Sequence, residues 1–154
     1  MRVNSRDIGG NSDKLVYHHH KSNLHSVWDK EMIETRIGEL GEVSYSDFLI
    51  NQIKKGSYKD LKDSWVSTRD VTEITPMNNS AVAIEYAIDS NSYSCKGIWS
   101  TFEEEEGNDY SGVYYQKMNY LVDLQLAKGG VRLAHHLNQV LATCAAPSSL
   151  ARRR

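Results

Sequence analysis

The sequence is poor in the features that mark disulfide-rich and membrane proteins. Its 154 residues include only 2 cysteines, Cys95 and Cys144, so a framework of several disulfides is excluded. No run of about 18 apolar residues occurs, which argues against a transmembrane helix. The first residues lack the apolar stretch of a secretory signal peptide. We therefore expect no membrane partner, and no signal peptide within these residues.

The sequence also lacks a large excess of charge of one sign. The formal net charge is -2 and the isoelectric point is near 6.3. This balance argues against binding of nucleic acid by a broad basic surface. Any recognition of phosphate would then have to come from a bound metal ion. The length fits one domain, and a hydrophobic content of 40% is enough to bury a core.

The spacing of apolar and capping residues predicts a mainly α protein with one small β-hairpin near the N-terminus. Residues 14–17 form one arm of the hairpin. Asn23 is a suitable N-cap for the first long helix, which Gly41 ends. We expect a tight corner at Gly129-Gly130, between the last two helices. The expected helical segments are 23–40, Ser44 or Ser46 to Gly56, a short turn at 59–66, 81–100, 109–127 and 131–142.

Three segments are predicted to be irregular. Residues 68–79 contain Pro76 and adjacent asparagines, which favour a loop. Residues 103–106 are four consecutive glutamates, and we interpret them as a solvated loop because adjacent carboxylates repel each other. Residues 143–154 are predicted to form a disordered tail.

The segment from Asn23 to Asp29 is the most informative part of the chain. His25 and Asp29 are four residues apart, so on a helix they project from one face and can converge on one divalent cation. Imidazole and carboxylate together suit zinc. The spacing alone favours a solvated surface ion pair, because a histidine and an aspartate four residues apart occur by chance on many surface helices. Nearby apolar residues would face away from the metal and into a core: Val27, Trp28, Met32 and Ile33.

Three motifs occur in a characteristic order. They are Gly-Gly-Asn at residues 9–11, Asn-Leu-His-x-x-Trp-Asp at residues 23–29 and Gly-Gly-Val-Arg-Leu-Ala at residues 129–134. In this order and spacing the chain, from about Arg6 to Leu141, resembles the zinc-dependent, single-strand-specific class I (S1/P1-type) nucleases. The resemblance implies the helical fold of the phospholipase C and S1/P1-type nuclease kind. It also implies that residues 1–142 are the C-terminal portion of a nuclease domain whose N-terminal half is absent from this chain.

The same resemblance implies a function. Family members are zinc-dependent phosphodiester hydrolases (endonucleases) that cleave single-stranded DNA and RNA to 5'-phosphorylated products, with up to three zinc ions. By resemblance, His25 and Asp29 match the last two protein ligands of one zinc site, and Ile8 and Asn11 match substrate-binding residues of the cleft. The other ligands have no counterpart here, so we expect at most one partial zinc site and impaired activity.

The resemblance has further implications for partners and modifications. The expected partners are single-stranded nucleic acid or nucleotides and the missing N-terminal half, and the expected location is the secretory pathway or the exterior. Cys95 matches a cysteine that forms a disulfide to the N-terminal half in the family. Asn78 begins an Asn-x-Ser sequon, which would make a secreted form a glycoprotein.

Alternatives remain open at this point. The chain could be a non-catalytic truncated homologue, or a helical interaction module in which His25 and Asp29 are surface residues, and no catalytic residue is assigned. We interpret residues 18–20, three histidines, as a flexible polar turn, because consecutive side chains point in different directions. Arg132 is predicted to be structural, reaching a carboxylate or a helix C-terminus.

Overall fold

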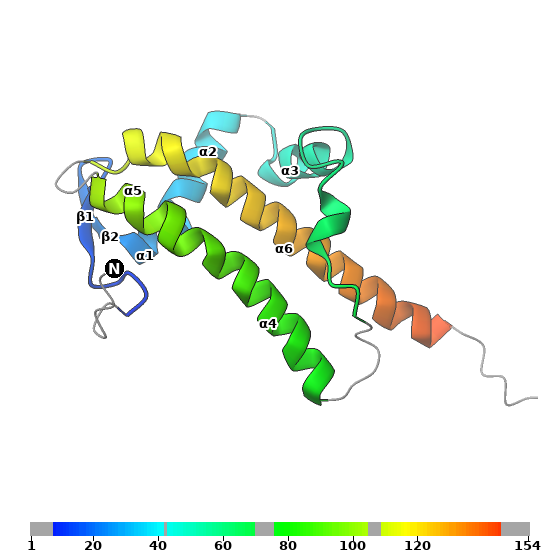
Figure 1. Ribbon diagram of the computed structural model, residues 1–154. Coiled ribbons are helices and arrows are strands. Elements are labelled where there is room, and N and C mark those ends of the chain that lie inside the picture. The colour runs from blue at the N-terminus through cyan, green and yellow to red at the C-terminus, as the bar shows by residue number, and fades with distance from the viewer. Residues whose placement is uncertain (1–7, 42, 70–75, 105–108, 146–154) are drawn as a thin grey trace, which may run out of the picture.

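The computed structural model describes residues 8–41, 43–69, 76–104 and 109–145. Figure 1 shows a long helix, α6, that runs along the molecule, with α4 on one side of it and the hairpin at the end where α6 begins. The mainly α fold with one small hairpin is confirmed. The elements are β1 (Lys14–Tyr17), β2 (His20–Asn23), α1 (Leu24–Ser26), η1 (Val27–Glu31), α2 (Met32–Leu40), α3 (Tyr45–Lys54), η2 (Lys62–Trp65), α4 (Pro76–Tyr93), η3 (Ser94–Ile98), α5 (Trp99–Glu104) and α6 (Val113–Ala145).

The predicted helix ends are confirmed for the first two helices. The side chain of Asn23 accepts a hydrogen bond from the backbone N–H of Ser26 at 3.0 Å, which satisfies one free donor of the first turn. Gly41 ends α2 with φ +62°, a conformation that glycine adopts without steric cost. Ser44 caps α3 by accepting from the N–H of Asp47.

Two helical segments contain π-helical turns. Both η1 and η3 are five-residue π-helices within otherwise α-helical segments, 24–40 and 76–104. A π turn inserts one extra residue and shifts the side chains that follow around the helix axis; such turns are frequent at functional sites. The first of them begins two residues after His25 and contains Asp29.

The predicted corner at Gly129-Gly130 is wrong. These glycines lie in the middle of α6, a continuous helix of 33 residues. Glycine is unfavourable there, but Lys128 and Arg132, on either side of the pair, both bind Asp89 of α4. These tertiary interactions hold the helix continuous where the local sequence favours a break.

The predicted loop at residues 68–79 is too long. Helix α4 begins at Pro76 rather than Ala81, because proline suits the first turn of a helix, where its missing N–H is not needed. Asn78 of the sequon therefore lies in a helix, although its side chain is not among those described. The charge run at 103–106 is helical as far as Glu104, and its last two residues lie outside the described ranges. Helix α6 includes residues 143–145 of the expected tail, and residues 146–154 lie outside the description.

The main core lies at the hairpin end of the molecule. It joins β1, the first helical segment and the beginning of α6, and Trp28 and Ile33 pack against it. The predicted orientation of the first helix is therefore confirmed, since its apolar side chains are buried beneath it. The buried members are Leu15, Tyr17, Leu24, Val27, Met32, Tyr110, Tyr114, Tyr115, Met118 and Val122.

Candidate metal centre

His25 and Asp29 lie beside each other on one face of the first helical segment. His25 Nε2 is 3.0 Å from Asp29 Oδ2, and the two side chains are 46% and 66% exposed. Two ligand atoms on one tetrahedral zinc ion, with bonds of about 2.1 Å, would be about 3.4 Å apart. The two side chains therefore need only a small adjustment to bind one ion, and both are open to solvent.

A backbone carbonyl fixes the orientation of the imidazole. His25 Nδ1 is 2.9 Å from the carbonyl oxygen of Gly9. A carbonyl can only accept, so Nδ1 carries the proton and donates it. In the neutral ring this leaves the lone pair on Nε2, the nitrogen that faces Asp29. Histidine ligands of metals are commonly held in this way, by a carbonyl or carboxylate on the other ring nitrogen.

The turn that supplies this carbonyl has an unusual backbone. Ile8, Gly9 and Gly10 have φ angles of +52°, +64° and +86°, and a positive φ is rare for a β-branched residue such as isoleucine. The side-chain amide nitrogen of Asn11, Nδ2, closes the turn by donating to the carbonyl of Ile8 at 2.8 Å. Residues with such backbone strain concentrate at functional sites.

Close packing holds the turn against the start of the helix. A Cβ on Gly10 would lie 3.1 Å from the backbone nitrogen of His25 and 3.3 Å from Cβ of Leu24. Only glycine fits this space at its positive φ. The Gly-Gly-Asn motif and the helix motif, 12 positions apart in the sequence, thus form one unit around His25.

The structure brings the four predicted site residues into this unit. Ile8 and Asn11 lie in the turn, and His25 and Asp29 lie on the helix that the turn contacts. The side chain of Ile8 is 75% exposed, so it is accessible to a ligand. The side-chain amide nitrogen of Asn11 is engaged within the turn, where it donates to the carbonyl of Ile8.

The partly buried Trp28 and the buried Tyr114 anchor the helical segment that carries His25 and Asp29. Trp28 Nε1 donates to the hydroxyl of Tyr114 on α6 at 2.9 Å, and the two rings pack edge to face. Burial raises the pKa of Tyr114, and the hydrogen bond from Trp28 opposes this effect. The tryptophan of the helix motif therefore positions η1, and with it Asp29, on the core.

The donor set fits zinc in kind but not in number. Imidazole and carboxylate are usual zinc ligands, and a structural or catalytic site takes three or four protein ligands. Among the described residues, no group of three or more His, Cys, Asp or Glu side chains gathers in one place. The part of the chain that the structure describes therefore offers two candidate ligands, fewer than a zinc site takes.

Asp109 is an organising residue that the sequence patterns did not identify. Its carboxylate accepts the backbone N–H of His18 at 3.0 Å and that of His19 at 2.7 Å, and both N–H and Oγ of Ser111. Burial by itself would raise its pKa, but these hydrogen bonds lower the pKa to about 2. An aspartate just before a helix was the available signal, but nothing in the sequence connects it to the hairpin.

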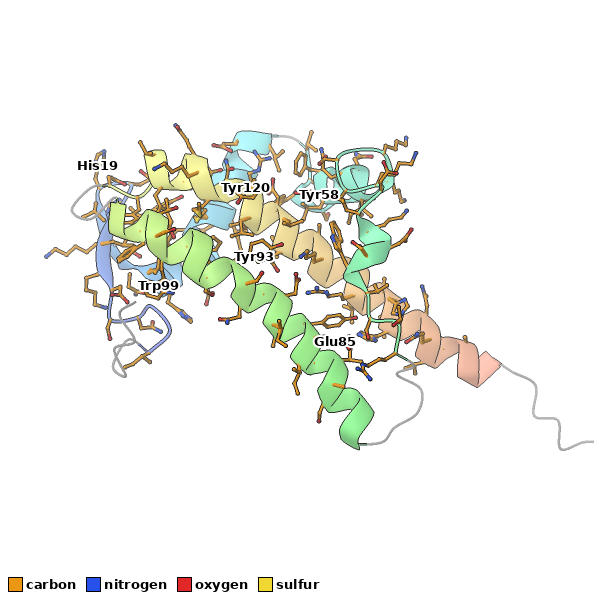
Figure 2. The ribbon with its side chains drawn as sticks, in the orientation of Figure 1. His19, Tyr58, Glu85, Tyr93, Trp99 and Tyr120 are labelled. Atoms are coloured by element: carbon orange, nitrogen blue, oxygen red, sulfur yellow. The ribbon has the colours of Figure 1, made fainter. Side chains whose placement is uncertain are left out.

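The histidine run is a hairpin turn, as predicted, but Asp109 orders it. His18 and His19 have φ angles of +47° and +64°, the conformation that a tight two-residue hairpin turn requires. The ring of His19 is 3.3 Å from Asp109 and is 95% exposed; Figure 2 labels it at the hairpin end of the molecule. Of the three histidines, His18 and His19 form the turn and His20 is the first residue of β2.

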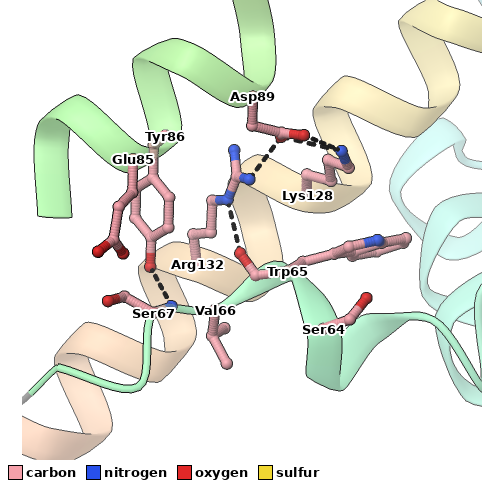
Figure 3. A pocket seen from close by; sticks show the side chains of 9 residues that line it. All are labelled: Ser64, Trp65, Val66, Ser67, Glu85, Tyr86, Asp89, Lys128 and Arg132. Carbon is pink, nitrogen blue, oxygen red and sulfur yellow. Dashed lines mark hydrogen bonds and ion pairs between the residues drawn. The ribbon is translucent and has the colours of Figure 1, made fainter. Parts of the chain in front are cut away.

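A second charged cluster joins α4 to α6 (Figure 3). Asp89 accepts from Lys128 Nζ at 2.9 Å and from Arg132 Nη2 at 2.6 Å. Burial favours a higher pKa for Asp89, but the hydrogen bonds from both cations outweigh it and lower the pKa. Arg132 also donates to the carbonyl of Trp65 at 2.9 Å and lies over the ring of Tyr86. The structural role predicted for Arg132 is confirmed.

This cluster borders a pocket of about 170 Å³. The cations lining it are already bonded to Asp89 and to neighbouring hydroxyl and carbonyl groups. We therefore interpret the pocket as part of a structural ion-pair network. The candidate site is the His25–Asp29 pair at the hairpin end.

The structure is that of a mainly helical protein in which a His–Asp pair is held in a fixed orientation near the N-terminal hairpin. The chain belongs to the family described as S1/P1 Nuclease, whose model matches residues 2–142. It is 32% identical over 138 residues to nuclease S1 of Aspergillus oryzae, and the match covers 87% of this chain and 46% of that protein. It is 33% identical over 137 residues to endonuclease 1 of Arabidopsis thaliana, covering 87% and 42%. Nuclease P1 of Penicillium citrinum is 28% identical over 137 residues, covering 86% and 49%. The chain thus spans about half the length of these relatives.

The comparisons confirm the resemblance to S1/P1-type nucleases and support nucleic acid as the substrate of the family. Among the described residues, no helix combines the length and the apolar character that crossing a membrane requires.

Proposed function

We propose that these residues supply one part of the catalytic domain of a zinc-dependent nuclease, which hydrolyses phosphodiester bonds in single-stranded DNA and RNA and leaves 5'-phosphorylated products. The observation that carries the proposal is the His25–Asp29 pair, with the imidazole held by the carbonyl of Gly9. A surface ion pair needs no such support for its imidazole.

His25 Nε2 and an Asp29 carboxylate oxygen would be two ligands of one zinc ion. Zinc in such a site lowers the pKa of bound water to near 7 and neutralises developing charge on phosphoryl oxygens. Gly9 holds the tautomer of His25, and the turn 8–11 holds Gly9. Ile8 offers an exposed apolar side chain against which a base could pack, and Asn11 offers an amide oxygen beside it.

The remaining ligands would come from the part of the domain that the relatives have beyond the matched segment. With two ligands, zinc keeps most of its coordination sites for water, so affinity should be low. We therefore expect these 154 residues alone to be weakly active or inactive. Secretion and the disulfide of Cys95 belong to the same proposal and rest on family resemblance. Glycosylation at Asn78 rests on its Asn-x-Ser sequon and requires secretion.

A zinc titration tests the ligand pair. Zinc is added to the wild-type chain, to His25→Ala and to His19→Ala, in competition with a fluorescent chelator. His19 is a matched control because it also lies beside an aspartate, at 3.3 Å from Asp109. We expect His25→Ala to remove the zinc binding of the wild type and His19→Ala to retain it. Equal affinity of wild type and His25→Ala would refute the proposed ligand.

Activity is tested in a protein that contains this chain within a full-length domain. Removing a metal ligand should cost at least as much as removing a residue that supports one, which is about 10–100-fold. Asp29→Asn should therefore reduce hydrolysis of denatured DNA at least about 100-fold, with the loss partly restored by excess zinc. Unchanged hydrolysis would exclude a role for Asp29 in the metal site.

A further inference from the structure

The second half of α6 has an apolar face that the described residues leave exposed. Its large side chains are spaced by three, four and seven residues, so they lie on one side of the helix. They are 42–61% exposed: Leu126, Leu133, Leu137, Val140 and Leu141. We call this set, with the two glycines described next, the α6 face. The roughly opposite side carries Lys128 and Arg132, which bind Asp89 of α4. A contiguous exposed apolar surface of this kind marks an interaction site.

Two glycines lie in the middle of the same face. Gly129 and Gly130 are three and four residues after Leu126, and four and three residues before Leu133, so all four lie on one side of the helix. Both glycines are exposed. A Cβ placed on either of them would meet no heavy atom within 4 Å.

Gly129 and Gly130 lower the stability of α6, and no contact with a described residue explains why glycine occurs at these two positions. Apart from proline, glycine is the least favourable residue inside a helix. No turn occurs here, since α6 is continuous, and no described side chain needs the space. Glycine in such a position allows another backbone to approach closely. The pair therefore indicates an external segment that packs directly against α6.

A groove adjoins the α6 face. It has a volume of about 530 Å³ and lies between α4 and α6, where Val82 and Ala83 face Gly129 and Val140. Gly129 and Val140 belong to both the groove and the face. A partner helix lying on the face could thus place apolar side chains in the groove.

We propose that the α6 face is the docking surface for an apolar helix of the remaining part of the S1/P1 nuclease domain, and that this helix crosses α6 at Gly129-Gly130. The argument for this occupant is length. The matched segment covers 46% of nuclease S1 and 42% of Arabidopsis endonuclease 1, so more than half of a typical domain is available to cover the face. The proposal rests on family membership and does not require zinc binding.

The test uses a substitution that should act in opposite directions on the free and the docked chain. Gly130→Gln replaces glycine by a good helix former, so it should raise the melting temperature of the 154-residue chain by about 2 °C. The new side chain would obstruct the docked helix. Gly38→Gln is the matched control, because Gly38 is also an exposed glycine inside a helix with no atom near its Cβ, and it lies on α2, away from the α6 face.

The probe is a second chain that holds the residues of Aspergillus oryzae nuclease S1 outside the matched segment, coexpressed with this chain and also fused to it. We expect copurification, and in the fusion a single melting transition above that of the free chain. Gly130→Gln should weaken association at least about tenfold, a loss of about 1.4 kcal/mol, and lower the melting temperature of the fusion. Gly38→Gln should change the association less than twofold.

Three outcomes would overturn the proposal. One is separate melting of the two parts in the fusion, with the transition of this chain unchanged. Another is an equal effect of Gly130→Gln on the free chain and on the fusion. The third is a dimer of the free chain that Gly130→Gln dissociates in light scattering, because the occupant would then be a second copy. None of these measurements depends on nuclease activity, so they are independent of the zinc titration above.

Discussion

Asp89 is the single carboxylate that two buried cations share, and Asp89→Asn tests how much the packing of α4 on α6 depends on it. The side chains of Lys128 and Arg132 are 6% and 12% exposed. Asparagine keeps the shape of the side chain but has one acceptor oxygen in place of two, and its NH2 group is a donor. It cannot balance two positive charges, so the substitution leaves at least one cation buried without a counterion.

The expected loss follows from the burial. Removing one partner of a buried ion pair costs about 3–5 kcal/mol, and Asp89 itself is 30% exposed. We therefore expect the lower end of that range, about 3 kcal/mol. For a domain of this size the melting temperature should fall by about 6–12 °C. Chemical denaturation in urea at neutral pH gives the free energy of unfolding directly.

Glu85→Gln is the matched control. Glu85 lies one turn before Asp89 on α4 and pairs with Arg69, but the two side chains are 42% and 52% exposed. An exposed pair is screened by solvent and contributes little to stability. If Asp89→Asn cost no more than Glu85→Gln, the cluster would not be the interaction that holds α6 to α4.

The pH dependence provides a second check on the same residue. The pKa of Asp89 is lowered from its ordinary value of 3.8 in the folded protein, so its contribution is present above that value and is lost as the pH falls through the folded pKa. The difference in unfolding free energy between wild type and Asp89→Asn should therefore shrink below pH 3.8. A difference that stayed constant down to pH 2 would show that charge is not its origin.

Two further substitutions test the candidate site. Asp109→Asn should reduce stability at neutral pH by about 2 kcal/mol, because a folded pKa of about 2 against 3.8 corresponds to that amount; this difference should vanish as the pH falls from about 4 to about 2, measured by urea denaturation at each pH. Gly10→Ala should lose about 2 kcal/mol, because alanine is strained at φ +86° and its Cβ would crowd His25. Gly38→Ala should instead stabilise the chain, and equal effects of the two alanines in thermal melts would contradict the role of Gly10.

Local sequence rules predicted the features that depend on neighbouring residues. Asn23 and Ser44 are caps and Gly41 is a helix end in the structure, because each acts within one turn of its own position. The position of His25 beside Asp29 follows from helical periodicity in the same way. The contact between Gly9 and His25 could be anticipated only from the family resemblance, which places the two motifs together.

Features that depend on distant residues could not be predicted in this way. The continuity of α6 through Gly129-Gly130 depends on Asp89, about 40 positions earlier, which binds both Lys128 and Arg132. The shape of the histidine turn depends on Asp109, about 90 positions later. In both cases a carboxylate from a distant segment stabilises one of the local conformations that the neighbouring residues allow.

Three features of the chain are only partly explained by the described contacts. The backbone of Ile8 is held at a positive φ, the imidazole of His25 is held beside a single carboxylate, and two poor helix formers, Gly129 and Gly130, lie within a continuous helix under an exposed apolar face. Under the two proposals above, each would be explained by the same addition, a segment that contributes further ligands to the proposed zinc site at the hairpin end and covers α6 along its second half. Because these features lie on different elements and involve different chemistry, a common origin in one absent part of the domain is simpler than a separate explanation for each. The fusion with the nuclease S1 segment tests this directly, since it should both raise zinc affinity at His25 and bury the α6 face.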